Sequence, residues 1–393
     1  MTAYDDRPIP RTHPSVIATA ARRRSLTPPP LSNARVLEVG CAHGVNLMAM
    51  AARLPDARFV GVDIDARAIE IAARRAAEAR LDNVTFACVD LSALDDEGPY
   101  DYVIAHGVLS WVAPAVAEAL FALLARVLAP EGLAYVSYDA KPGACMREAL
   151  GLGLRAAPHS DDVLETLRDS PALAGSPAGA WLAAEVSAAL QRPRSYREQQ
   201  FMGEQHALCV GEVWDWARRH QLHYVHDVAE VGLPAEAVAR TRAAVERCAS
   251  ERRAVEQLFD VAIMRQFRAT ILGRQAPGIE VAVARDAPPA RNVPLRPRVR
   301  PLCRLEAREL GFVSTDAHVA RAVHPLHGLL IEHCDGARDH AALGQVVIEA
   351  VRNGTLELPS EAGTPATLEE VEAGIDLVLG AAIADLASAG VVV

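Results

Sequence analysis

Three acidic side chains stand at the ends of short apolar runs in the first quarter of the chain. Glu38 precedes a turn of small residues, Gly40 to Gly44, and Asp63 and Asp90 each close a later apolar run. Such a turn lets backbone approach a ligand closely, and the start of the helix that follows attracts a carboxylate. An acid before the turn suits a cation, Asp63 can accept from two ribose hydroxyls, and Asp90 can accept from an adenine amino group. The spacing predicts S-adenosylmethionine as the cofactor and S-adenosylhomocysteine as its product.

A dinucleotide is the other ligand class that uses a glycine turn after a strand. It needs the pattern G-x-G-x-x-G, because a pyrophosphate must lie on the helix N-terminus. The frame here is Gly40-x-Ala42-x-x-Val45, so two of the three glycines are missing, and Glu38 would repel a pyrophosphate. The pattern therefore favours S-adenosylmethionine over a dinucleotide.

Apolar runs and helical spacings alternate around these acids. Strands followed by helices predict right-handed crossovers and a parallel, doubly wound α/β sheet. Ligands bind at the carboxyl ends of such strands, where His106 closes the fourth run. The expected strands are 35–39, 58–62, 84–89, 101–105 and 133–138, and the expected helices are 15–24, 45–54, 66–80 and 115–128.

The pattern changes after Tyr138. Helical stretches broken by prolines fill 145–198, and a segment rich in Pro and Arg follows 275. We expect helices at 209–220 and 234–263, short strands at 222–226 and 267–272, and tail helices at 325–333, 340–352 and 368–389. The predicted divisions are an arm and helix (1–30), the cofactor-binding core (31–145), a helical region (146–275), a linker (276–301) and a small, mostly helical C-terminal domain (302–393).

Composition excludes several functions. A net charge of −10 argues against a nucleic-acid partner. The seven cysteines lack a C-x-x-C pair, and the polar N-terminus lacks the apolar core of a signal peptide, so we expect a cytoplasmic protein. The chain has no run of eighteen apolar residues, so we expect no membrane span. His220, His223 and His226, and the pair His324 and His327, lack further ligands nearby, so we expect no metal. Lys141 is the only lysine.

The chain resembles class I S-adenosylmethionine-dependent methyltransferases. More narrowly it resembles a bacterial group described as methyltransferases with a regulatory domain, which includes protein-lysine methyltransferases acting on outer-membrane proteins. The likeness covers about the first 275 residues. The segments that carry it are Tyr4-Asp5-Asp6, Thr12-His13-Pro14, 37–42, 104–108, 110–112, 135–138 and 260–270.

The resemblance implies a fold and a set of cofactor residues. The fold is a seven-stranded Rossmann-like methyltransferase sheet, completed by the strands at 222–226 and 267–272, with the helices between 145 and 198 inserted over the substrate side. Separately from the resemblance, the helices expected in the tail predict a small helical C-terminal domain, with a winged helix as one form. Glu38, Gly40, Gly44, Asp63 and Asp90 would hold the cofactor, and Cys41, Asn46, Ile64, Leu91 and His106 would line its pocket.

Methyl transfer is an in-line displacement that depends mainly on positioning and electrostatics. A lysine acceptor must also lose a proton, for which an acid or a tyrosine would help. The catalytic candidates are Tyr4, His13, His106 and Tyr138. Here the chain departs from the group: 201–206 lacks the usual His-Glu pair, and Leu109 replaces an aromatic residue.

Three functions are compatible with the sequence. The first is methylation of a protein or ribosomally made peptide side chain, with the tail reading the peptide by strand addition. The second is N- or O-methylation of a small metabolite, and the third is a non-catalytic binding protein. The alternative role for the tail is packing or dimerisation, so a homodimer is compatible with the sequence as well.

Overall fold

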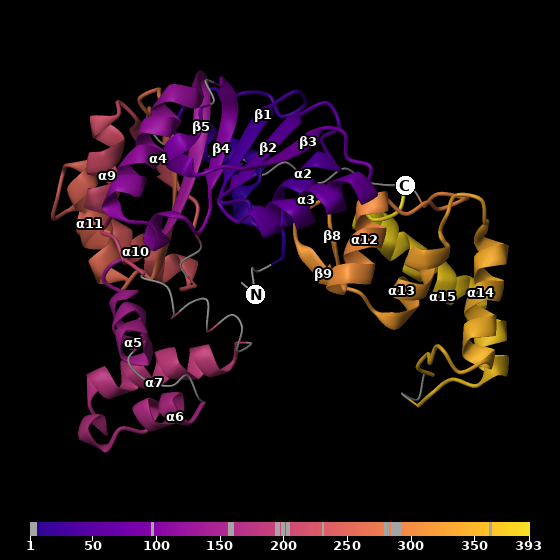
Figure 1. Ribbon diagram of the computed structural model, residues 1–393. Helices are drawn as coiled ribbons and strands as arrows, with labels where there is room; N and C mark the ends of the chain where they lie inside the picture. The colour runs from indigo at the N-terminus through magenta and orange to yellow at the C-terminus, as the bar shows by residue number, and fades with distance from the viewer. Residues whose placement is uncertain are drawn as a thin grey trace.

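The computed structural model describes residues 6–95, 98–155, 161–192, 197, 201, 205–229, 232–278, 281, 283, 293–360 and 364–393. Figure 1 shows a central α/β domain with a group of helices below its β5 end and a second domain beside α3. No helix in the described part of the chain is both long enough and apolar enough to cross a membrane.

The central sheet has seven strands in the order β3-β2-β1-β4-β5-β7-β6. Strands β1 to β5 are parallel, and β7 runs antiparallel to both of its neighbours. The predicted seven-stranded sheet is confirmed, and its first five strands are parallel as expected; the antiparallel direction of β7 is a feature that the sequence did not indicate. The chain leaves the carboxyl end of β6 and re-enters the sheet at that same end, so β7 must reverse. The strands are β1 (Arg35–Val39), β2 (Arg58–Asp63), β3 (Val84–Cys88), β4 (Tyr100–Ala105), β5 (Leu128–Asp139), β6 (His223–Asp227) and β7 (Phe267–Gly273).

Helices cover both faces of the sheet, which explains why the inner strands are largely apolar. On one face Val36 and Ile104 share a core with α1 (Pro14–Arg23), α2 (Val45–Ala51) and α3 (Ala66–Glu78). On the other face Leu37 and Val103 pack with α4 (Pro114–Val127) and α9 (Val210–Arg219). Short 3-10 helices lie at Pro10–Thr12 (η1), Leu91–Ala93 (η2), Leu109–Trp111 (η3) and Pro171–Leu173 (η4).

The helical insertion follows β5 and has a small core of its own. It comprises α5 (Cys145–Arg155), α6 (Asp161–Arg168) and α7 (Pro177–Leu190), which bury Leu154 and Val186 between them. The stretch expected to be helical over 234–263 is two helices, α10 (Ala235–Glu246) and α11 (Arg252–Ala262).

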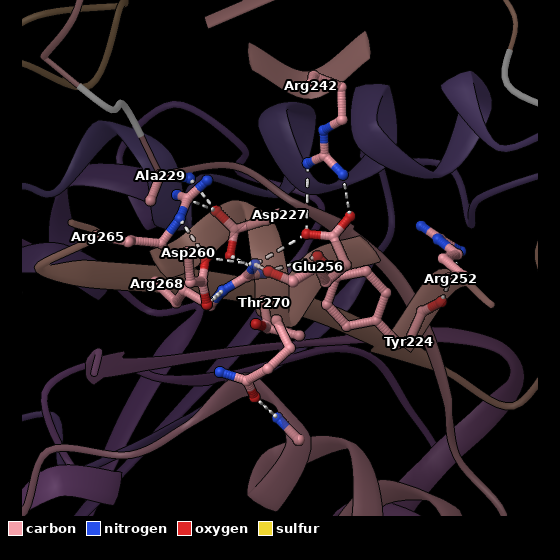
Figure 2. A network of polar contacts seen from close by, with 12 residues as sticks. Tyr224, Asp227, Ala229, Arg242, Arg252, Glu256, Asp260, Arg265, Arg268 and Thr270 are labelled. Carbon is pink, nitrogen blue, oxygen red and sulfur yellow. Dashed lines mark hydrogen bonds and ion pairs between the residues drawn. The ribbon is translucent and has the colours of Figure 1, made fainter. Parts of the chain in front are cut away.

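A buried charge network ties β6, β7 and α11 together (Figure 2). The fully buried guanidinium of Arg268 donates to both carboxylate oxygens of Asp260, each at 2.8 Å, and to Glu256 at 2.8 Å. Arg242 also contacts Glu256 at 2.8 Å. Burial alone would raise the pKa of Glu256, but the charges of Arg268 and Arg242 hold it down at about 2. Because guanidinium and carboxylate groups neutralise each other here, the network can stay buried.

The C-terminal domain contains four helices and a short hairpin among the described residues. They are α12 (Pro301–Leu310), β8 (Phe312–Ser314), β9 (Ala320–Ala322), α13 (Pro325–His333), α14 (His340–Arg352) and α15 (Leu368–Ser388). The sequence predicts the last three helices but neither α12 nor the hairpin. Leu302 and Leu305 of α12 belong to the core of the α/β domain, whereas Cys303 belongs to the core of the C-terminal domain. Helix α12 therefore joins the two cores.

Candidate cofactor and acceptor site

The turn after β1 contains two positions, Gly40 and Gly44, that exclude a larger side chain. Gly40 and Gly44 have φ values of +73° and +71°, a region that glycine adopts without strain. A Cβ atom on Gly44 would lie 2.5 Å from the Phe86 ring. The backbone N–H groups of Gly40 and Cys41 both donate to the Val62 carbonyl, at 2.8 and 3.1 Å. These bonds hold the turn against β2 at the carboxyl edge of the sheet.

Glu38 lies beneath this turn and is buried. Its Oε1 accepts a hydrogen bond from Asn46 Nδ2 at 2.7 Å, while its Oε2 has no partner among the described residues. Burial raises the pKa of Glu38 to about 8. An unpaired buried carboxyl oxygen is costly, and a cationic group placed beside it would satisfy it. Glu38 thus fits the ammonium group of S-adenosylmethionine.

Asp63 lies at the end of β2 and faces the turn. Its Oδ2 accepts from Ala42 N at 2.8 Å, and its Oδ1 accepts from Asp65 N at 3.0 Å. An ionised carboxylate can accept about four hydrogen bonds. Two backbone donors therefore fix the orientation of Asp63 and leave capacity for ribose hydroxyls.

Ile64, Asp90 and Leu91 lie beyond the ends of the neighbouring strands β2 and β3. Ile64 is 70% exposed, an unusual place for a large apolar side chain, and Leu91 is half-buried. Asp90 is exposed and caps η2 through a 2.7 Å bond from Ser92 N. Apolar surface with an adjacent acid suits an adenine ring, in keeping with the placement that the resemblance implies.

The N-terminal arm packs against the cofactor turn. Ile9 N donates to Asn46 Oδ1 at 2.9 Å, and Asp6 contacts His43 at 2.7 Å. His13 caps α1 by accepting from Ser15 N. Burial, with a smaller effect from Arg53, lowers the pKa of His13 to about 4. The catalytic candidate Tyr4 lies outside the described residues.

His106 packs against residues of β5 and β7, and this group is called the acceptor side of the candidate site. His106 Nδ1 lies 2.9 Å from Ser137 Oγ and 3.1 Å from the Tyr135 hydroxyl. Its ring lies 6.0 Å from the Phe267 ring, over which Arg11 is placed at 4.7 Å. Burial, then Arg11, lowers the pKa of His106 to about 3. His106 is therefore neutral near pH 7 and packed among polar and aromatic groups.

Tyr138 points to the opposite face of β5. It is 1% exposed and packs in the core that contains α4 and α9, with its hydroxyl 3.4 Å from Thr270 Oγ1. Side chains alternate across a strand, so Tyr135 and Ser137 face the site and Tyr138 cannot. We do not retain Tyr138 as a catalytic candidate.

Asp139, which sequence reasoning missed, lies at the same edge as Ser137 and on the same face of β5. It accepts from Arg147 Nη1 at 3.1 Å and from Gln205 Nε2, and its backbone N–H donates to Ser110 Oγ at 2.9 Å. Burial raises the pKa of Asp139. The alternation of Tyr135, Ser137 and Asp139 along the strand is the signal that could have found it.

The regularly spaced histidines do not gather around a metal position. Within the described ranges no group of three or more His, Cys, Asp or Glu side chains is placed to hold a metal ion. His220, the first of these histidines, instead contacts Glu118 at 2.7 Å.

Two family models match the chain, in the order that the fold suggests. Residues 36–132 match a methyltransferase domain, and residues 296–391 match "PKMT, C-terminal winged helix domain". The trans-aconitate 2-methyltransferase of Azoarcus sp. is 30% identical over 223 residues, which are 55% of this chain and 80% of that protein. The chain therefore belongs to the class I methyltransferases, whose cofactor is S-adenosylmethionine. The winged-helix form considered for the tail is confirmed.

Other similar proteins match different shares of the chain. Two uncharacterized proteins of Rickettsia prowazekii are 34% identical over 154 residues and 30% identical over 288 residues, or 38% and 68% of this chain. The matched parts are 62% and 51% of those proteins, so the chain spans only about half to three fifths of their length. The structure of PKMT2 from Rickettsia typhi in complex with AdoHcy superposes with a TM-score of 0.83, covering 99% of this chain and 100% of that one at 18% identity. That likeness shows a shared fold across both domains.

Proposed function

We propose that this chain transfers the methyl group of S-adenosylmethionine to a protein side chain, and that the acceptor is a lysine amine. The observation that carries the proposal is the winged-helix domain fused to the methyltransferase domain, since the matching family model is that of PKMT proteins. The fold shared with PKMT2 along the whole chain supports it. A small-metabolite enzyme needs no such second domain.

The acceptor side of the site has the groups that an amine would need. When bound, S-adenosylmethionine supplies an electrophilic methyl group. Asp139 would attract a lysine ammonium, and its raised pKa makes it a better proton acceptor than an ordinary aspartate. The neutral ring of His106 adds no competing positive charge. The chain's own residues thus act by positioning the amine and receiving its proton.

A second candidate function has its own observation. The trans-aconitate methyltransferase relative suggests a carboxylate acceptor. Arg11 lies at the acceptor side, and its buried Nε has no hydrogen-bond partner among the described residues. A guanidinium in this position would bind a small carboxylic acid, which makes O-methylation of a small metabolite the alternative.

Transfer of labelled methyl groups into cell extract separates the two candidates. The extract is incubated with the protein and with S-adenosylmethionine that carries tritium in its methyl group. It is then fractionated by size, and the protein fraction is hydrolysed for amino-acid analysis. We expect label in protein and recovery of methylated lysine. Label confined to small molecules would overturn the proposal in favour of the alternative.

The matched control is Asp63→Ala. Removal of the ribose-binding carboxylate should weaken cofactor binding by about 1–3 kcal/mol and reduce labelling in proportion. Unchanged affinity in a folded variant would contradict the placement of the ribose at Asp63.

A further inference from the structure

Three segments that are distant in the sequence meet at the side chain of Asn46. Its Oδ1 accepts from Ile9 N of the arm at 2.9 Å and lies 2.7 Å from His318 Nε2. Its Nδ2 donates to Glu38 Oε1 at 2.7 Å. Asn46 is 6% exposed and His318 only 2%. The arm, the cofactor helix α2 and the C-terminal domain therefore share one buried hydrogen-bond cluster.

His318 lies in the β8–β9 hairpin, between the two strands. Because Asn46 directs its amide nitrogen to Glu38, its oxygen must accept, so His318 Nε2 carries the proton. Burial, then the neighbouring His13, lowers the pKa of His318 well below its usual value, which keeps the ring neutral. Its Nδ1 is buried without a partner among the described residues. The hydrogen bond that the ring makes here is therefore the one that Nε2 donates to Asn46.

The hairpin is held against the α/β domain by Arg53. Arg53 Nε contacts Asp316 Oδ1 at 3.1 Å, and its Nη1 donates to Ser314 Oγ at 3.2 Å. Within the C-terminal domain, the backbone N–H of Asp316 donates to the carbonyl of Ala389, the residue after α15, at 3.0 Å. The position of His318 therefore depends on docking of the whole C-terminal domain.

We propose that His318 is a positioning residue for the cofactor. By donating to Asn46 it fixes the amide that holds Glu38, and Glu38 keeps one oxygen directed to the ammonium of S-adenosylmethionine. The inference rests on the proposed function in so far as this chain binds that cofactor. It adds that the C-terminal domain sets the affinity of the methyltransferase domain for the amino-acid end of the cofactor, in addition to any role with the acceptor.

The test is calorimetric titration of the full chain with S-adenosylhomocysteine. His318→Ala should raise the Kd by about tenfold, the effect of one buried hydrogen bond lost. His318→Gln, whose amide can donate from a similar position, should restore most of the affinity. His333→Ala is the matched control, because His333 belongs to the same domain but not to this cluster.

A second variant reaches the cluster without touching the ring. Arg53→Gln releases the hairpin and should weaken binding in the same direction as His318→Ala. Thermal melting reports whether each variant is folded, and if His318→Ala does not fold, Arg53→Gln decides. Unchanged affinity in a folded His318→Ala protein, or in Arg53→Gln when that variant decides, overturns the inference. A wild-type chain that binds no S-adenosylhomocysteine would instead overturn the proposed function.

Discussion

Glu38 combines two properties that conflict in the free protein. Its carboxyl is buried, which favours the protonated form, yet the group that would satisfy its unpaired Oε2 is a cation, which favours the ionised form. The pKa of about 8 in the free protein expresses the first property. Binding of an ammonium group must lower that pKa and release a proton.

Cofactor affinity should accordingly depend on pH. Below pH 8 the bound ammonium must displace the proton of Glu38, so affinity for S-adenosylhomocysteine should rise with pH by up to about tenfold per unit and level off above pH 8. Calorimetry in buffers of different ionisation enthalpy would count the released proton. In Glu38→Gln this dependence should disappear, and a wild-type profile as flat as that of the variant would contradict the mechanism.

Individual residues are predictable from the sequence only where the chain makes them neighbours of a motif. Glu38, Asp63 and Asp90 follow from their positions around successive strands. His318 could not be found, because it contacts Asn46 across 272 positions and no local pattern marks it. The sequence favours Tyr138 over Asp139 because it shows a tyrosine near the end of a strand. It does not show which face of the strand that tyrosine occupies.

At the scale of elements, the glycine turn is limited by two separate requirements. Gly44 has a positive φ, and a Cβ atom added there would meet the Phe86 ring at 2.5 Å. Gly107, which lies after β4 and outside this turn, is the comparison. It has a φ of +65°, and an added Cβ would meet no described atom within 4 Å. Gly107→Ala should lose about 1–2 kcal/mol of unfolding free energy from backbone strain. Gly44→Ala should lose about 1–3 kcal/mol more from overpacking.

Denaturant unfolding of the two variants measures that difference. The turn and the Phe86 contact predict that Gly44→Ala is clearly the less stable protein. Equal losses in the two variants would show that the backbone conformation alone, and not the packing of the turn against β3, requires glycine.

The network around Arg268 should be far more sensitive than exposed ion pairs. Arg268→Met leaves Asp260 and Glu256 buried without their main partner, and breaking a buried pair in this way costs about 3–5 kcal/mol. Arg219→Met removes an exposed pair with Glu118 and should cost about 0–1 kcal/mol. Urea unfolding of both variants checks the contrast, and similar losses would mean that the network is not a source of stability.

At the scale of the whole molecule, Glu306 is a buried acid of α12 that links domain stability to pH. It accepts from Ser314 N at 2.7 Å and from Ser314 Oγ at 2.9 Å, and burial raises its pKa to about 7. A pKa raised above the unfolded value of 4.5 favours the folded state at low pH, and this contribution is lost as pH rises from about 4.5 to 7.

Glu306→Gln should therefore be more stable than wild type at pH 8, by up to about 3 kcal/mol, and similar to it at pH 4.5. The measurement is the difference in unfolding free energy between the two proteins across that range, in which the other titrating groups cancel. Glu369→Gln, at an exposed position on α15, serves as the control. A difference that does not change with pH would contradict the buried position of Glu306.

The overall architecture is predictable in proportion to the length of its elements. Strands and helices of the α/β domain alternate over long periodic stretches, and α14 and α15 of the tail are long as well. The hairpin strands β8 and β9 have three residues each, too few for a period to appear. Helix α12 begins at Pro301, directly after a Pro- and Arg-rich segment that conceals its start. The placement of β7 between β5 and β6 depends on contacts that no local pattern records.

Lys141, two residues beyond Asp139, gives the molecule an analytical advantage. A chain of 393 residues with a single lysine brings almost no acceptor amines of its own into a methylation reaction. Self-labelling can therefore occur at only one internal amine, and a single peptide examined by mass spectrometry accounts for it. Methylated lysine found anywhere else in a reaction mixture must come from the substrate.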